Sequence, residues 1–211
     1  MAEPTLYDFW RSSASYRVRI ALNLAGIAYK TVSVDLVAKD NRAPEHMARN
    51  PQGLVPVLEL DGNRFTQSLA IIEYLNEARG LGWLPDDPAE RAGVRALAYS
   101  VAVDVHPVCN VSVAAHVSEL TGGTKGTRKA WSRHFIGPGL AAFEQLLAGF
   151  EQAPYCAGAT VSLADICLVP QVYNAERWDI DFEPLPRIRA VTQACRAHPA
   201  FAAADPDAVK P

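Results

Sequence analysis

The chain has 211 residues, 49% of them hydrophobic, which is enough to build one large domain or two small ones. Its formal net charge is −3 and it has no lysine or arginine block, which argues against nucleic acid or an anionic membrane as partners. No apolar stretch is long enough to cross a bilayer, and we expect no signal peptide. The four cysteines are scattered without metal-ligand spacing, so we expect buried, reduced thiols, no metal site and a cytoplasmic location.

A serine-rich segment connects a predicted strand, residues 5–9, to a predicted helix. The helix pattern consists of apolar residues at the spacing of one buried face: Val18, Ala21, Leu22 and Ala25. Ser12, Ser13 and Ser15 therefore lie at the first helical turn, where unpaired N–H groups and a partial positive charge favour an anion such as phosphate, carboxylate or thiolate. The alternative is that one of these serines only caps the helix.

Strand and helix patterns continue to alternate up to about residue 80. They are a strand at 28–34, an irregular polar stretch at 39–49, a turn at 50–53, a hairpin of strands 55–60 and 64–66 joined by Asp61-Gly62-Asn63, and a helix at 67–78. This order, β-α-β followed by β-β-α, predicts a small sheet with helices packed on it.

The chain beyond the linker pattern at 80–88 is mostly helical, with helical spacing at 91–99, 140–150 and 188–195. Residues 101–107 stay undecided, because their valines alternate as in a strand while Pro107 would kink a helix. Ser162 and Asp165 have the form of an N-capping box, which we favour over a catalytic Ser/Asp pair.

Two dipeptides add candidate binding positions. A cis bond between Val55 and Pro56 would turn the Val55 backbone N–H and C=O towards an extended peptide, whereas an ordinary trans proline would only start a strand. Gln67 and Ser68 open a helix whose N-terminus can bind a carboxylate, with simple helix capping as the alternative.

Together these positions resemble the thioredoxin-like half of a cytosolic glutathione transferase. The segment from Phe9 to Leu22 is similar to the signature of the zeta class, whose usual form is S-S-C-x-x-R-V-R-I-A-L. Four further segments match that class: 50–56, 67–75, 164–172 and 174–177. The resemblance implies the cytosolic glutathione transferase fold, with an α+β thioredoxin-like glutathione-binding domain at 1–82 and an all-α substrate-side domain at 88–211. It also implies a homodimer and a helical 101–107 segment.

The resemblance further implies glutathione as the cofactor and assigns residues to it. Ser12 would hydrogen-bond the thiolate, Val55 next to Pro56 would pair with the cysteinyl unit, and Gln67 with Ser68 would hold the γ-glutamyl carboxylate. The helical domain would contribute His106, Asn110 and Ser112. Apart from the resemblance, His106 beside Pro107 would be interpreted as a core or capping histidine.

The activity implied is glutathione-dependent isomerisation of maleylacetoacetate in tyrosine and phenylalanine breakdown. Because this small enedione dicarboxylate is a dianion, we expect a cationic pocket, and guanidinium groups bind carboxylates bidentately. Arg11 and Arg177 are the candidates, completing a catalytic set with Ser12 and Ser13, although either arginine would also suit a salt bridge. Arg17 and Arg19 lie within the first helix and are expected to be structural.

One position departs from the family pattern, because Ala14 stands where the zeta class usually has cysteine. This puts a covalent role of a protein thiol in doubt, while glutathione can still supply the thiol. Three alternatives therefore stay open: a maleylpyruvate isomerase, a general zeta-class transferase or dehalogenase acting on small α-halo acids, and a glutathione-fold binding module without turnover. Retention of Ser12, Val55-Pro56 and Gln67-Ser68 argues against the last.

Overall fold

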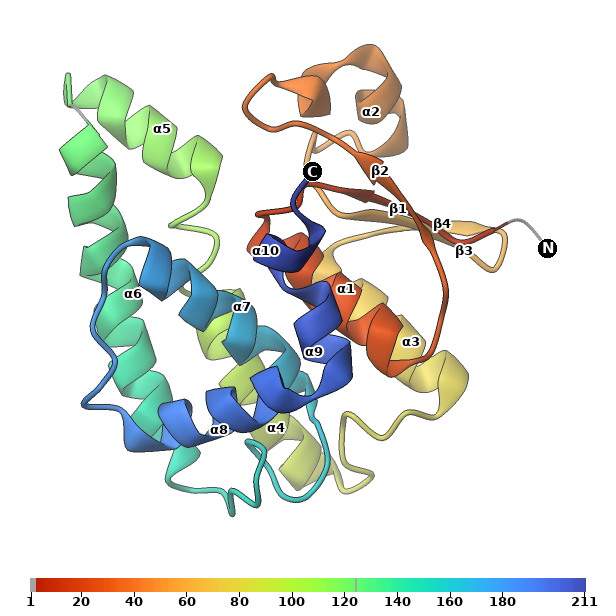
Figure 1. Ribbon diagram of the computed structural model, residues 1–211, viewed down its shortest axis with the longest axis vertical. Coiled ribbons are helices and arrows are strands. Elements are labelled where there is room, and N and C mark those ends of the chain that lie inside the picture. The colour runs from red at the N-terminus through yellow and green to blue at the C-terminus, as the bar shows by residue number, and fades with distance from the viewer. Residues whose placement is uncertain (1–2, 124) are drawn as a thin grey trace. The chain divides into compact units, whose positions relative to one another are not determined.

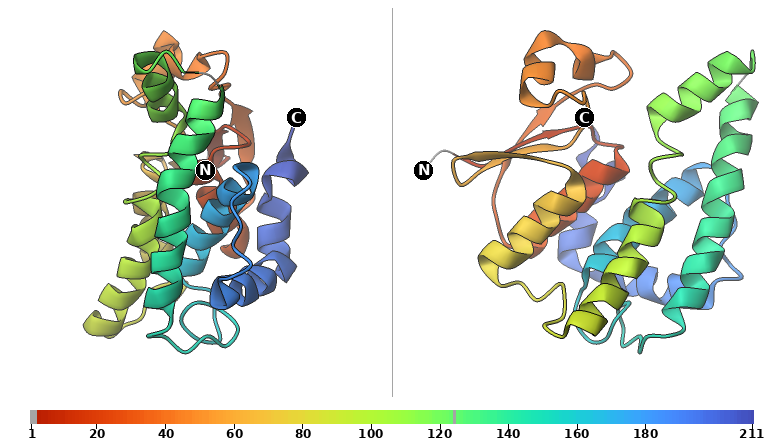
Figure 2. Two further views of the ribbon diagram at one scale, coloured as in Figure 1. Left: turned by 90° about the vertical axis from the view of Figure 1, so that its left-hand side faces the viewer. Right: turned by 180° about the vertical axis from the view of Figure 1, so that it is seen from behind.

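The computed structural model describes residues 3–123 and 125–211 and divides the chain into two compact units. Unit 1 comprises Met1–Gly82 and His198–Pro211, and unit 2 comprises Trp83–Ala197. Unit 1 contains the sheet and unit 2 is helical, so the expected combination of an α+β part and an all-α part is confirmed (Figures 1 and 2). Among the described residues, no helix combines the length and apolarity needed to cross a membrane.

The sheet of unit 1 has four strands in the order β2-β1-β3-β4. The strands are β1 (Thr5–Asp8), β2 (Lys30–Ser33), β3 (Val57–Leu60) and β4 (Asn63–Thr66). β1 pairs parallel with β2 and antiparallel with β3, and β3 and β4 form the predicted hairpin. Asp61 and Gly62 both have positive φ in its turn, the conformation that an Asp-Gly pair favours.

Helices α1 (Ser13–Leu24) and α3 (Ser68–Arg79) pack against each other on one side of the sheet (Figures 1 and 2). The prediction of an irregular stretch at 39–49 is wrong, because this segment contains a 3-10 turn η1 (Asp40–Arg42) and a short helix α2 (Pro44–Arg49). Only His46 of α2 is buried, so a six-residue helix with one inward side chain leaves no apolar periodicity to detect.

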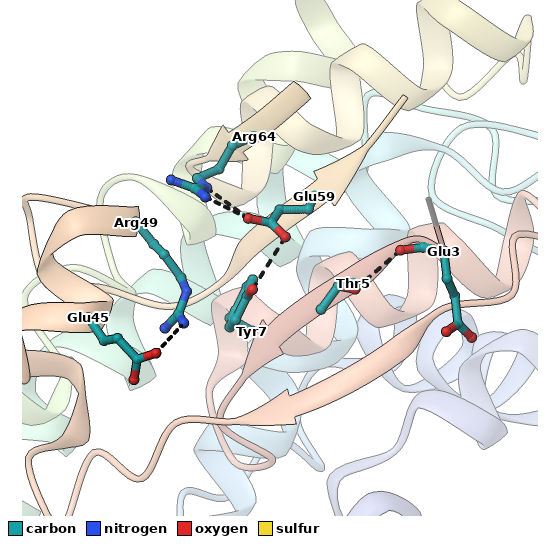
Figure 3. A network of polar contacts seen from close by, with 7 residues as sticks. All are labelled: Glu3, Thr5, Tyr7, Glu45, Arg49, Glu59 and Arg64. Atoms are coloured by element: carbon teal, nitrogen blue, oxygen red, sulfur yellow. Dashed lines mark hydrogen bonds and ion pairs between the residues drawn. The ribbon is translucent and has the colours of Figure 1, made fainter. Parts of the chain in front are cut away.

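Helix α2 contacts the face of the sheet that carries Tyr7, Glu59 and Arg64 (Figure 3). The Arg49 guanidinium lies 4.4 Å from the centroid of the Tyr7 ring. The Tyr7 hydroxyl donates to Glu59 at 3.3 Å, and Glu59 also accepts from Arg64. Arg49 thus connects α2 to β1, and Tyr7 and Glu59 extend the network across β3 and β4.

The C-terminal residues 198–211 belong to unit 1, whereas the sequence placed them in the second domain. They form α9 (Pro199–Ala204) and α10 (Pro206–Val209). The buried guanidinium of Arg19 explains the difference, because it donates to the Ala204 carbonyl at 3.0 Å, forms an ion pair with Asp8 at 2.7 Å and donates to the Trp10 carbonyl at 2.9 Å. Arg19 is therefore structural, as expected.

Unit 2 consists of α4 (Pro88–Ala102), α5 (Val111–Leu120), α6 (Lys125–Leu147), α7 (Leu163–Arg177) and α8 (Pro186–Ala197). The expectation of a helix over 101–107 is wrong beyond Ala102, because α4 ends there and residues 103–109 form turns. Proline lacks an N–H and disfavours a helical residue before it, which accounts for the early end of α4.

The N-capping box at the start of α7 is confirmed. The Asp165 carboxylate accepts from both the backbone N–H and the hydroxyl of Ser162, at 2.8 and 2.6 Å. It also accepts from the Cys156 N–H at 2.8 Å. Asp165 is fully buried, and this burial raises the pKa of its carboxyl group. All its oxygens thus serve the fold, which leaves no catalytic role for the pair.

Candidate functional site

Ser12 is the N-cap of α1, and its geometry reconciles the two interpretations of the serine cluster. Its Oγ accepts from the Ser15 N–H at 3.2 Å, while its own N–H donates to the Phe9 carbonyl at 2.8 Å. A hydroxyl that accepts through a lone pair still has its proton to donate. Ser12 can therefore cap the helix and donate to an anion, beside the partial positive charge of the helix N-terminus. Ser13 follows as the first residue of α1 and is buried.

The turn before Ser12 lies on an apolar cluster at the strand ends. Phe9, Val34 and Val55 are buried together, and Tyr7, Trp10 and Leu36 pack against them. This cluster links the residue after β1 with the residue preceding Pro56. It therefore brings the Ser12 turn and the Val55 loop to the same region of unit 1.

The Val55–Pro56 peptide bond is cis, the first of the two alternatives that the sequence left open. The ladder between β1 and β3 begins only at Val57, and within residues 3–123 and 125–211 the backbone N–H and C=O of Val55 have no hydrogen-bond partner. The preceding carbonyl, that of Leu54, is held by His46 Nε2 at 3.0 Å and Asn50 Nδ2 at 2.9 Å. Val55 thus presents an unused backbone donor and acceptor on a fixed loop, which suits pairing with a peptide-like ligand.

Gln67 and Ser68 lie at the start of α3. Gln67 has φ +66°, a conformation that costs a non-glycine residue about 1–3 kcal/mol and that occurs often at functional sites. Its Nε2 donates to Gln52 Oε1 at 2.8 Å. The Ser68 hydroxyl accepts from the buried Arg17 guanidinium at 3.3 Å, which leaves the Ser68 proton available for an acceptor. Arg17 is thus structural, and it also orients a predicted ligand-binding residue.

Arg11 follows the apolar cluster and precedes Ser12. Its guanidinium carbon lies 5.9 Å from the Phe9 ring centroid and 5.3 Å from the Trp10 ring centroid. Among the residues that the structure describes, no carboxylate forms an ion pair with it. Its charge is therefore available to an anion.

The predicted residues of unit 2 lie in the segment between α4 and α5, in the first turn of α5 and at the end of α7. Asn110 is the N-cap of α5, where its Oδ1 accepts from the Val113 N–H at 2.9 Å and from the Ser112 hydroxyl at 2.8 Å. His106 is half-buried, and its N–H donates to the Val101 carbonyl at 3.0 Å. Asn110 and Ser112 thus form a local cap and still expose polar atoms.

Arg177 is the last residue of α7 and is exposed, with its Nη1 donating to Asn174 Oδ1 at 3.5 Å. Helix α6 connects this end of α7 with the segment that carries His106 and Asn110. Trp131 of α6 donates to the Val108 carbonyl at 2.8 Å, and Arg133 donates to the Trp178 carbonyl at 2.8 Å. One helix therefore supports both groups of predicted residues in unit 2.

The protein thiols do not suit nucleophilic catalysis. All four cysteines are buried, as predicted. Burial raises the pKa of the Cys109 thiol, next to Asn110, to about 11. Burial also raises the pKa of Cys156 and of Cys195. The raised pKa values of these three thiols favour the protonated form at neutral pH, which disfavours them as nucleophiles.

Thiol titration tests this inference. With a disulfide reagent at neutral pH, we expect no fast-reacting thiol in the folded protein and four thiols after unfolding in denaturant. For Cys109, whose pKa is about 11, the rate should keep rising with pH beyond about 9, where an ordinary thiol of pKa about 8.5 has levelled off. A fast-reacting thiol at neutral pH would contradict the assignment.

Sequence patterns missed several residues that support the site: His46, Asn50, Gln52 and Arg17. The structure brings the predicted residues of unit 1 to the ends of its strands and the starts of α1 and α3. A donor hydroxyl, a free backbone pair and a polar helix start together suit a peptide-like ligand that carries anionic groups. The asparagine that begins the 50–53 turn was the one available signal, since Asn50 also holds Leu54.

Comparisons with known proteins agree with this geometry. Residues 2–77 match the family model described as "Glutathione S-transferase, N-terminal domain", and residues 139–199 match "Glutathione S-transferase, C-terminal domain". The chain is 58% identical to maleylacetoacetate isomerase of Rhizobium meliloti (strain 1021) over 210 residues, which cover 99% of each protein.

Solved structures are similar over the full length. A holo structure of maleylpyruvate isomerase, a bacterial zeta-class glutathione S-transferase, has a TM-score of 0.92 and 41% identity, covering 98% of both chains. Maleylacetoacetate isomerase of Methylobacterium extorquens AM1, with bound malonate and glutathione, has a TM-score of 0.91 and 39% identity, covering 97% of both chains.

Proposed function

The chain belongs to the zeta-class glutathione S-transferase family, and from this premise we propose that it catalyses the glutathione-dependent cis–trans isomerisation of maleylacetoacetate to fumarylacetoacetate. The Ser12 hydroxyl carries the proposal, because it caps α1 through its oxygen and keeps its proton for a thiolate. The family cofactor, glutathione, fits the donors and acceptors of unit 1.

The residues of unit 1 have separable tasks. When bound, glutathione supplies a thiolate that adds to the conjugated double bond, allows rotation about the resulting single bond and leaves again. Ser12 and the N-terminus of α1 favour the anionic sulfur and lower the pKa of the thiol. Val55 binds the peptide backbone, while Gln67 and Ser68 hold the γ-glutamyl carboxylate.

The substrate carboxylates are bound by two arginines, Arg11 of unit 1 and Arg177 of unit 2. His106, Asn110 and Ser112 provide further polar contacts, and Ser13 lies beside the reacting centre.

The side-by-side assay of two substrates tests the proposal. Purified protein is given maleylacetoacetate or maleylpyruvate, each with and without glutathione, and kcat/KM is compared. We expect the larger value with maleylacetoacetate and no turnover without glutathione. Faster reaction with maleylpyruvate would favour the second candidate, which the fold similarity to maleylpyruvate isomerase supports. Conjugation or dehalogenation of small α-halo acids exceeding isomerisation would favour a general transferase.

Replacing Gln67 with glycine is expected to separate stability from binding. Glycine adopts positive φ without strain, so Gln67→Gly should stabilise unit 1 by up to about 1 kcal/mol. Loss of the side-chain amide should weaken glutathione binding roughly tenfold, since hydrogen bonds to charged groups contribute about 1.5–3 kcal/mol. Thermal unfolding and calorimetric titration measure the two effects. Gln52→Ala removes the acceptor that orients the Gln67 side chain but keeps its amide, so it should weaken affinity less than Gln67→Gly does.

We also propose a homodimer that works in the cytoplasm in tyrosine and phenylalanine breakdown. The resemblance to zeta-class enzymes supports the dimer, and the reduced, buried cysteines suit a reducing compartment. Light scattering during size-exclusion chromatography tests the dimer, and a mass of one chain would contradict it.

A further inference from the structure

A second cation lies beside Arg11 on the indole ring of Trp10. Lys210 Nζ is 5.4 Å from the Trp10 ring centroid, and the Arg11 guanidinium carbon is 5.3 Å from the same centroid. Both distances lie within the range of a cation–π contact. The chain therefore places two cations from opposite ends of its sequence on one residue, two positions before Ser12.

The C-terminal segment is held against α1 by contacts within unit 1. Asn23 donates to the Ala200 carbonyl at 3.0 Å, Arg19 donates to the Ala204 carbonyl at 3.0 Å, and the Tyr16 hydroxyl donates to Asp205 at 3.3 Å. These contacts lead the chain along α1 towards its N-terminus, as Figure 1 shows for α9 and α10. Lys210 follows α10 directly, so its position on Trp10 results from a defined path.

The two cations on Trp10 form no ion pair among the described residues. Of the carboxylates on neighbouring segments, Asp8 is paired with Arg19 at 2.7 Å, and Asp205 accepts from the Tyr16 hydroxyl and the Asp207 N–H without pairing with either cation. The Trp10 ring attracts each cation through its quadrupole without neutralising its charge.

We propose that Arg11 and Lys210 form an anion-recruiting patch on Trp10 that attracts small dicarboxylates to the site at Ser12. The proposal rests on the proposed function, because it identifies Lys210 as an additional specificity-determining cation for the same substrate class. Arg11 follows Trp10 and precedes Ser12, so a dianion attracted to the patch arrives next to Ser12, where the thiolate of bound glutathione is proposed to lie. Lys210 is exposed, so its effect is a long-range attraction that salt screens.

Binding of malonate provides a test without turnover, since a relative was solved with malonate and glutathione bound. Malonate is titrated calorimetrically into glutathione-saturated protein at low and at high ionic strength. At low ionic strength, Lys210→Gln should weaken malonate binding roughly threefold to fivefold, the range of an exposed charge contact. At high ionic strength the native protein and the variant should converge. Lys210→Arg, which keeps the charge, should bind as the native protein does.

Lys30→Gln is the matched control, because Lys30 is an exposed lysine on β2 of the same unit. It should leave malonate affinity within about 1.5-fold of the native value at either ionic strength. Unchanged malonate binding in Lys210→Gln at low salt, or an equal loss in Lys30→Gln, would overturn the patch. A loss that persists at high salt, together with a lower melting temperature, would show that Lys210 only fixes the tail and would overturn it too. Salt-dependent malonate binding in a protein without isomerase activity would instead remove the proposed function and leave the patch standing.

Discussion

Replacing Ser12 with alanine is expected to slow isomerisation roughly 10- to 100-fold while glutathione affinity changes little. The Ser12 oxygen already accepts from the Ser15 N–H, so the hydroxyl proton is the group left to stabilise a thiolate. A hydrogen bond to a charged group contributes about 1.5–3 kcal/mol, and its loss should raise the pKa of the bound thiol. The ultraviolet absorbance of the thiolate, followed against pH in the glutathione complex, measures this pKa directly.

Stability must be separated from chemistry in this experiment, because Ser12 also caps α1. Loss of an N-cap by substitution with alanine costs about 1 kcal/mol, whereas glycine at the same position costs only a few tenths. Ser12→Gly should therefore be nearly as stable as the native protein and as slow as Ser12→Ala. Ser12→Thr keeps both the cap and the hydroxyl and should retain most activity. If the thiolate absorbance of bound glutathione is the same in native protein and Ser12→Gly, then Ser12 is only a cap.

Local patterns were sufficient to predict much of unit 1. Alternating apolar side chains identify β1, the Asp61-Gly62 turn identifies the hairpin, and the apolar face after Ser13 identifies α1. The same patterns located the cap at Ser12, because capping follows from the residue before a helical face. What they left open was whether Ser12 caps or binds an anion, and the hydrogen-bond geometry makes these roles compatible.

Contacts between residues distant in sequence were beyond such patterns. The bond from Arg17 to Ser68 joins residues 51 positions apart, and the bond from Arg19 to Ala204 joins residues 185 positions apart. Neither leaves a periodic trace, so the support beneath Ser68 and the assignment of residues 198–211 to unit 1 were missed. In α5, exposed valine and leucine residues such as Val111 and Leu120 obscure the buried face that periodicity would detect.

Replacing Arg177 with alanine is expected to lower kcat/KM for maleylacetoacetate about 10- to 100-fold, with glutathione affinity within about twofold of the native value. A substrate carboxylate would lose a charge-assisted contact of about 1.5–3 kcal/mol, while the predicted glutathione contacts lie mainly in unit 1. Arg177→Lys keeps the charge but not the planar fork, so it should recover only part of the loss. Arg11→Ala should also reduce kcat/KM, since the Arg11 charge has no ion-pair partner among the described residues.

Arg91→Ala is the control for a lost guanidinium in unit 2. Arg91 lies in the first turn of α4, whereas His106 follows the other end of that helix, so at about 1.5 Å per residue they are well over 10 Å apart. Its replacement should leave kcat/KM unchanged. Steady-state kinetics and glutathione titration of all four variants decide the question. Native kcat/KM in both Arg177→Ala and Arg11→Ala would exclude a dianion pocket built from these arginines, and equal losses in Arg91→Ala would show that the effect is one of total charge.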